Sequence, residues 1–262
     1  MKNDVVEKIA GFANSHQMNI HQQGTGRPLL ILHGGAGPIS VAAFVSEMAK
    51  SHHVIAPTHP GFGLTPRPEQ LDSVPKLAAL YGEMLAVAGI QNTLVMGSSI
   101  GGWIAAELML AAPENLAGAM LVDACGIVVP GETVLDVFTT PPAKLADFSF
   151  HDADRYRIDP SKLTEQQLAL MKANFATLAI YGGKQNMQDE TLCRRLAETR
   201  CPCAVVWGKS DRVVTPAYGR AYANAIPGAS FIVIEICGHL PQMEQMAELV
   251  KILSNFEASL TQ

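Results

Sequence analysis

A serine stands in the pentapeptide Gly97-Ser-Ser-Ile-Gly101, between two segments of different character. Residues 92–96 are mostly apolar and β-branched, and residues 102–110 favour a helix. A serine at a tight strand-to-helix turn projects its hydroxyl above the sheet, and the N-terminus of the helix behind it stabilises developing negative charge. Glycine is needed on both sides, because a side chain there would collide with the neighbouring strand and helix. We therefore expect Ser99 to be a nucleophile.

A second motif begins with an apolar run and opens into the glycine-rich loop His33-Gly-Gly-Ala-Gly37. Backbone N–H groups in such a loop can approach a ligand oxygen closely, so Gly35 and Ile100 are expected to form an oxyanion hole. A dinucleotide-binding loop is the alternative, but Ser40 stands where its third glycine belongs. No Gly-Lys-Ser/Thr follows, which excludes a phosphate-binding P-loop, and no cofactor is expected.

An acid and a base follow two later apolar runs. Asp211 lies on the turn after Gly208, and His239 follows Cys237-Gly238 at the end of the last strand-like run. Histidine is the natural general base near neutral pH, and a carboxylate at its far nitrogen fixes the tautomer. Ser99, Asp211 and His239 are therefore the expected catalytic residues. Asp123, at the end of an earlier apolar run, is the alternative acid.

These motifs together resemble the α/β-hydrolase fold superfamily, and in particular its small, cap-bearing serine hydrolases. The resemblance extends from the His33 loop through Pro60-Gly-Phe-Gly63, the Ser99 turn and the Asp211 turn to His239. The chain resembles both bacterial esterases and meta-cleavage-product hydrolases. The resemblance implies a helical cap inserted after the sixth core strand.

Strand and helix signals alternate along the chain, which predicts an α/β fold with a mostly parallel central sheet and helices on both faces. The expected strands are residues 17–22, 28–33, 53–57, 92–97, 118–123, 203–207 and 230–236. The expected helices are residues 39–49, 73–88, 100–111, 217–225 and 242–258. We expect a core domain of residues 1–126 and 201–262 and a cap of residues 127–200.

Within this cap, Thr164 and Gln167 form a capping-box signature. The apolar residues that follow recur at helical spacing: Leu168, Met171, Phe175 and Leu178. An ordinary packing face accounts for such spacing, and so does a lid whose underside shapes an apolar pocket. On the lid interpretation, Phe138, Met171 and Phe175 line the substrate pocket.

Composition excludes several classes of function. The net charge of −5 gives no electrostatic reason to expect nucleic acid or an anionic membrane as a partner. The five cysteines are scattered and odd in number, as is typical of reduced thiols in a cytoplasmic protein. Cys201-Pro-Cys203 lacks the two-residue spacer of zinc and redox motifs, so no metal site is expected. The expected partner is a small-molecule substrate.

The sequence thus predicts a serine hydrolase that cleaves a small, mainly apolar ester through an acyl-enzyme. Hydrolysis of a carbon–carbon bond in a dienoic ketone acid is one alternative, although Leu240 stands where meta-cleavage-product hydrolases tend to have tryptophan. The other alternative is a receptor that keeps the fold and binds a small molecule without turnover.

Overall fold

The computed structural model describes residues 2–183 and 186–260. Its large sheet has the strand order β1-β3-β2-β4-β5-β8-β9. The strands are β1 Ile20–Gln23, β2 Arg27–Leu32, β3 His52–Pro57, β4 Thr93–Ser98, β5 Leu116–Val122, β8 Cys203–Gly208 and β9 Ser230–Ile234. All neighbours pair in parallel except β1 with β3. The mostly parallel sheet confirms the expected fold class, and each expected strand is found.

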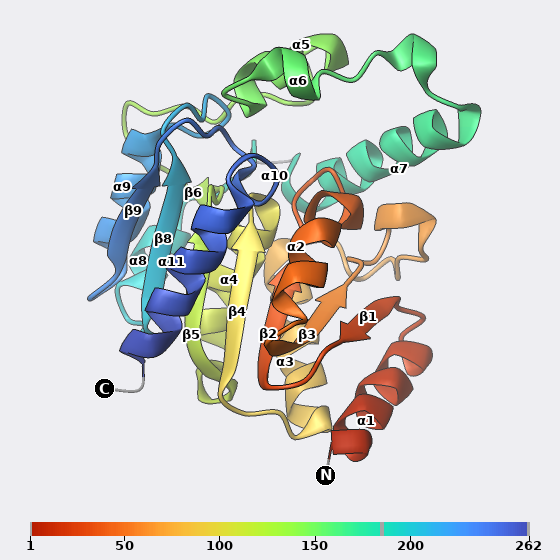
Figure 1. The fold of residues 1–262 in the computed structure, drawn as a ribbon, viewed down its shortest axis with the longest axis vertical. Helices are drawn as coiled ribbons and strands as arrows, with labels where there is room; N and C mark the ends of the chain where they lie inside the picture. The colour runs from red at the N-terminus through yellow and green to blue at the C-terminus, as the bar shows by residue number, and fades with distance from the viewer. Residues whose placement is uncertain (1, 184–185, 261–262) are drawn as a thin grey trace.

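Helices cover both faces of this sheet (Figure 1). The helices of the sheet region are α1 Lys2–Ser15, α2 Ala42–Met48, α3 Val74–Ala88, α4 Ile100–Ala111, α9 Pro216–Ala225, α10 Pro241–Glu244 and α11 Met246–Ser259. Alternate side chains of β2 belong to different cores: Leu30 and Leu32 pack with α1, α3 and α4, whereas Leu29 and Ile31 pack with α2 and α11. A strand buried on both faces explains why its sequence is an unbroken apolar run.

Local sequence sets several of the helix boundaries. The Thr164 side chain accepts a hydrogen bond from the Gln167 N–H, and the Gln167 side chain accepts one from the Thr164 N–H, so the expected capping box is present. At the start of α9 the Thr215 side chain accepts from the Tyr218 N–H, and Pro216 lies in the first turn. Gly89 ends α3 in the left-handed conformation that glycine adopts without strain.

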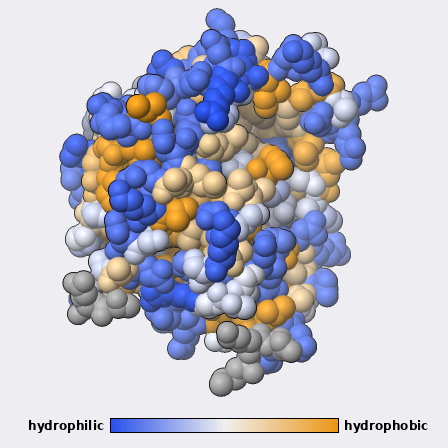
Figure 2. Space-filling view, in the orientation of Figure 1, coloured by the Kyte–Doolittle hydropathy of each residue, from blue (hydrophilic) through white to orange (hydrophobic). Residues whose placement is uncertain are grey.

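We call residues 127–200 the inserted segment. It follows β5, the fifth strand of the large sheet in chain order and not the sixth. Its elements, with the strand that leads into it, are β6 Gly126–Ile127, α5 Pro142–Ser149, α6 Ala153–Tyr156, α7 Glu165–Gly182, β7 Gln188–Asp189 and α8 Leu192–Leu196. Helices α5, α6 and α7 lie beyond the carboxyl ends of the parallel strands (Figure 1), and hydrophilic residues predominate along this outer edge (Figure 2).

The base of the inserted segment is tied to the sheet region. β6 pairs with β7, and α8 contacts α4 and α9. Arg195 of α8 donates to both carboxylate oxygens of Glu107 on α4, at 2.5 and 2.6 Å. Glu107 is only 3% exposed, so this bidentate pair supplies the partner that its buried charge requires.

The structure corrects the expected packing face of α7. Its buried residues are Asn174, Thr177, Leu178, Tyr181 and Gly182, whereas Met171 and Phe175 are only half-buried. Helix α1 was also absent from the expected helices. No helix in the described ranges combines the length and apolar character that crossing a bilayer requires.

Candidate active site

Ser99 occupies the turn between β4 and α4. Its backbone dihedral angles, φ 56° and ψ −119°, lie outside the regions that residues other than glycine favour. Main-chain bonds hold it there: the Ser99 N–H donates to the Val122 carbonyl at 2.9 Å, and its carbonyl accepts from the N–H groups of Gly102 and Trp103. Strain of this kind persists only where the surroundings impose it, which is typical of functional turns.

The flanking glycines are required by close backbone contacts, as the sequence predicted. A Cβ on Gly97 would overlap the Gly101 carbonyl, and a Cβ on Gly101 would overlap the carbonyls of Leu32 and His33. The strand and the helix can therefore approach closely only where both side chains are absent. Ser98, by contrast, is completely buried, and its hydroxyl has no partner among the described residues.

The glycine-rich loop lies against Ser99. A Cβ built on Gly34 would stand 3.3 Å from the Ser99 Cβ. Within the described part of the chain, the backbone N–H groups of Gly35 and Ile100 have no hydrogen-bond acceptor. Ile100 is the first residue of α4, where an N–H group has no intrahelical partner and the helix dipole favours negative charge. Both N–H groups are thus available to an anionic oxygen.

Two buried histidines hold this loop. His33 Nδ1 donates to the Gly34 carbonyl at 2.8 Å, and its Nε2 accepts from the His59 N–H at 3.0 Å. His59 Nε2 donates to the His33 carbonyl, so its Nδ1 accepts from the Tyr81 hydroxyl at 2.6 Å. Burial lowers the pKa of His33 to about 4 and that of His59 well below its ordinary value. Both rings are therefore neutral supports for the loop, not proton carriers.

Asp211 and His239 meet as the sequence predicted. His239 Nδ1 donates to Asp211 Oδ2 at 2.8 Å, and Asp211 Oδ1 accepts from the N–H groups of Val213 and Val214 at 2.8 and 3.1 Å. Both side chains are buried, and burial lowers the pKa of His239. The described residues contribute no hydrogen bond to His239 Nε2 and none between His239 and the Ser99 hydroxyl.

Asp123, the alternative acid, lies beside this pair. Its Oδ1 accepts from the Gly208 N–H at 2.9 Å, and its Oδ2 is buried with no partner among the described residues. Burial raises the pKa of both carboxyl groups, and the charge of Asp211 raises that of Asp123 further. Asp211 accepts from three N–H donors and Asp123 from one, so a negative charge is better stabilised on Asp211.

Donor atoms of Asp123, Asp211 and His239 lie within 4.8 Å of one another, a spacing that would also suit a metal ion. However, both Asp211 oxygens and His239 Nδ1 are already hydrogen-bonded. The geometry is that of a carboxylate orienting an imidazole and not of a free ligand set.

Helix α7 covers the glycine-rich loop. A Cβ on Gly35 would stand 2.9 Å from a Leu178 methyl group, so Leu178 packs directly against Gly35. Asn174 Nδ2 donates to the Ala36 carbonyl at 3.2 Å, and its Oδ1 accepts from the Gly63 N–H at 2.9 Å. The sequence identified none of these polar contacts.

The three residues expected to line a pocket are all only partly buried. Phe138 packs partly against the larger core near Gly183, and Met171 and Phe175 are half-buried and belong to neither core. One further residue was missed: Glu244 contacts the loop that carries His239. Its position five residues after His239 was the only signal available in the sequence.

The chain is similar to known hydrolases along most of its length. The chain is 27% identical to the 2-hydroxymuconate semialdehyde hydrolase of Pseudomonas putida, over 94% of this chain and 92% of that protein. It is 25% identical to Lipase 3 of Moraxella sp. (strain TA144), over 90% of this chain and 79% of the lipase.

Solved structures show the same fold. The meta-cleavage product hydrolase CumD (A129V mutant) superposes with a TM-score of 0.75 at 21% identity, covering 92% of this chain and 94% of that one. A bacterial membrane phospholipase A superposes with a TM-score of 0.75 at 22% identity, covering 99% and 92% of the two chains. The model of the alpha/beta hydrolase family matches residues 29–252, and the chain therefore belongs to that family.

Proposed function

We propose that this hydrolase is a serine esterase that cleaves small, mainly apolar esters with Ser99, His239 and Asp211. The observation that carries the proposal is the buried Asp211–His239 pair at the same sheet edge as the strained Ser99 turn. β5 lies between β4, which precedes Ser99, and β8, which precedes Asp211. Carboxyl ends of parallel strands lie along one edge of a sheet, and this shared edge supports a role for the acid–base pair at the serine.

The reaction follows from the proton positions. With its Nδ1–H bonded to Asp211, neutral His239 has a free lone pair on Nε2. His239 Nε2 takes the Ser99 hydroxyl proton while the serine oxygen attacks the ester carbonyl. The carbonyl oxygen becomes an oxyanion, which the N–H groups of Gly35 and Ile100 stabilise.

Collapse of the tetrahedral intermediate breaks the ester C–O bond. His239 then returns its proton to the departing alkoxide, and the acyl group remains on Ser99. Water, deprotonated by His239, attacks this acyl-enzyme and releases the carboxylic acid, which restores the Ser99 hydroxyl. Asp211 stays ionised throughout and stabilises the transient imidazolium.

The distribution of positive charge favours an uncharged ester over a dienoic ketone acid. Arginine is a common partner of a bound carboxylate, yet no Lys or Arg whose side-chain burial the structure describes is buried. The half-buried arginines already have partners: Arg27 pairs with Glu257, Arg195 pairs with Glu107 and Asp189, and Arg67 donates to three carbonyls. Carbon–carbon hydrolysis stays the second candidate, supported by the name of the Pseudomonas putida relative.

A substrate screen tests the proposal. p-Nitrophenyl esters of increasing acyl length and a dienoic ketone acid are offered in parallel, with Ser99→Ala as the control. We expect turnover of short to medium esters by the wild type and none by the variant. Turnover of the ketone acid alone would establish carbon–carbon hydrolysis. Absence of both turnover and fluorophosphonate labelling would instead favour a receptor.

A further inference from the structure

The loop that carries His239 is bonded to the inserted segment through its main chain. The His239 N–H donates to the Ser149 carbonyl at 2.7 Å. A Cβ on Gly238 would overlap the same carbonyl and stand 2.8 Å from the Phe150 Cα. The peptide around Ser149 therefore lies directly on the peptide that precedes the catalytic histidine.

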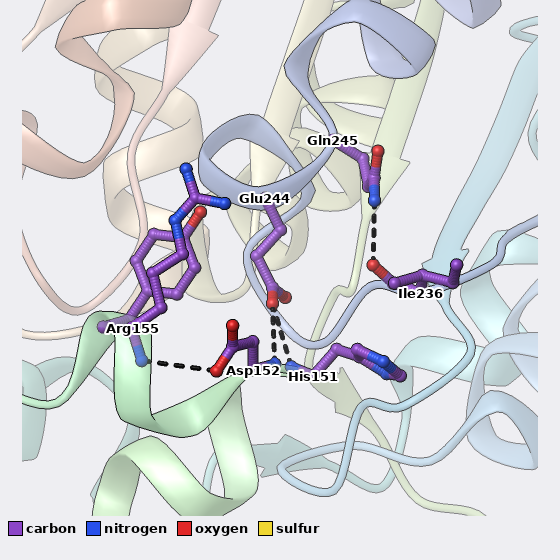
Figure 3. Close-up of a pocket in the computed structure, with 7 residues that line it drawn as sticks. His151, Asp152, Arg155, Ile236, Glu244 and Gln245 are labelled. Atoms are coloured by element: carbon purple, nitrogen blue, oxygen red, sulfur yellow. Dashed lines mark hydrogen bonds between the residues drawn. The ribbon is translucent and has the colours of Figure 1, made fainter.

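Glu244 connects the same two segments a second time. Its Oε2 accepts from the Gly238 N–H at 2.6 Å. Its Oε1 accepts from the N–H groups of His151 and Asp152, at 2.9 and 3.4 Å. Figure 3 shows the carboxylate reaching from the end of α10 to these two main-chain nitrogens. One side chain thus binds both the His239 loop and the inserted segment.

The acid loop is tied to the same stretch of the inserted segment. The Arg212 N–H, next to Asp211, donates to the Phe148 carbonyl at 3.1 Å. His151 Nδ1 lies 2.8 Å from the Ser210 hydroxyl. Residues 148–152 therefore contact the loops of both Asp211 and His239, and any displacement of this stretch acts on the pair.

A carboxylate is specifically suited to this position. It accepts three N–H groups with two oxygens, and each bond is strengthened by its charge. An amide has one accepting oxygen, so Glu244→Gln can satisfy the Gly238 N–H or the N–H groups of residues 151–152, but not both. Its NH₂ group would then face an N–H donor. The isosteric substitution removes one side of the bridge without opening a cavity.

We propose that Glu244 is a positioning residue that couples the inserted segment to the general base His239. The catalytic part of this inference rests on the proposed function. A small displacement of a general base can lower the rate by about 100-fold, because proton transfer requires near-ideal geometry. Glu244 touches neither the reacting bond nor the His239 ring, and it acts through the main chain that carries that ring.

The test compares Glu244→Gln with Glu235→Gln. Glu235 is a matched control, because it lies four residues before His239 but, among the described residues, pairs only with exposed Lys209. The rate of Ser99 labelling by a fluorophosphonate reports on His239, and melting temperature reports on stability. Amide hydrogen exchange of the peptides around residues 148–152 and 236–240 reports on the bridge itself.

For Glu244→Gln we expect labelling about 10- to 100-fold slower, a melting temperature lowered by only a few degrees and faster exchange in both peptides. Glu235→Gln should match the wild type in every measurement. Unchanged exchange in either peptide, or normal labelling despite faster exchange, would overturn the proposal. A wild-type protein that is never labelled would contradict the proposed function, whereas exchange would still decide whether Glu244 joins the two segments.

Discussion

Replacing Asp123 and Asp211 separately by asparagine distinguishes the two buried carboxyl groups. Asp211→Asn presents an NH₂ group to His239 Nδ1, which forces the proton onto Nε2 and blocks its role as base. The expected loss in kcat is about 10⁴-fold, the effect of holding the wrong tautomer in a triad. In Asp123→Asn, the amide oxygen keeps the bond from the Gly208 N–H and the NH₂ group takes the place of the protonated oxygen. We expect kcat to fall by less than about 10-fold, because no donor is lost.

Stability should respond to pH in a defined direction. Burial, followed by the Asp211 charge, raises the pKa of Asp123 well above its ordinary value. The folded wild type therefore keeps a proton that the unfolded chain releases above about pH 4. Its free energy of unfolding falls as pH rises, by up to about 1.4 kcal/mol per pH unit for this group. Asp123→Asn has no such proton, so its free energy of unfolding should not fall in this way. Relative to the wild type, it should rise by up to about 3 kcal/mol between pH 5 and pH 7.

The assay combines kcat on an ester with urea unfolding at pH 5, 6 and 7. Asp154→Asn is the control, because this carboxylate is exposed and its one ion pair within the described part of the chain is with Arg157. A large loss of kcat in Asp123→Asn with near-normal Asp211→Asn would make Asp123 the triad acid. A stability difference that does not change with pH would show that Asp123 is ionised in the fold.

Three further predictions follow from named contacts. Ser99→Ala should abolish fluorophosphonate labelling, with circular dichroism and melting temperature nearly unchanged; labelling of the variant would exclude Ser99 as nucleophile. Asn174→Ala should lower the free energy of unfolding by about 1–3 kcal/mol in urea, because two hydrogen bonds are lost, whereas exposed Lys172→Ala should not. Phe175→Ala should change which acyl length gives the highest kcat/KM, with little change in stability. Each methylene gained or lost in the pocket should alter the activation free energy by about 1–3 kcal/mol. An unaltered chain-length profile with lower stability would instead assign Phe175 to packing.

Much of the fold follows from the sequence because buried parallel strands require unbroken apolar runs. The strand at residues 93–98 is completely buried, and its sequence signals this directly. The Ser99 turn could be predicted equally well, because close backbone contacts require glycine at positions 97 and 101. Asp211 and His239 were predicted from chain order and turn position, and their contact confirms that they lie together.

Apolar periodicity failed on α7 for a physical reason. It predicts which residues avoid water, but α7 packs against loops whose main-chain groups need hydrogen-bond partners. Thr177 donates to the Gly61 carbonyl and Tyr181 to the Pro60 carbonyl, so the docked face is polar. Of the expected apolar face, only Leu178 is buried there.

Glu244 was missed for a related reason. Its partners on the inserted segment lie more than 90 residues earlier in the chain, and they are main-chain N–H groups that carry no sequence signature. Directional hydrogen bonds define the position of one segment on another more narrowly than apolar contacts, which tolerate sliding. The inserted segment meets the glycine-rich loop through Asn174 and the His239 loop through Glu244, and both contacts are of this directional kind. The placement of the inserted segment and the geometry of the site are therefore set by the same bonds, although each bond joins residues that local sequence patterns treat as unrelated.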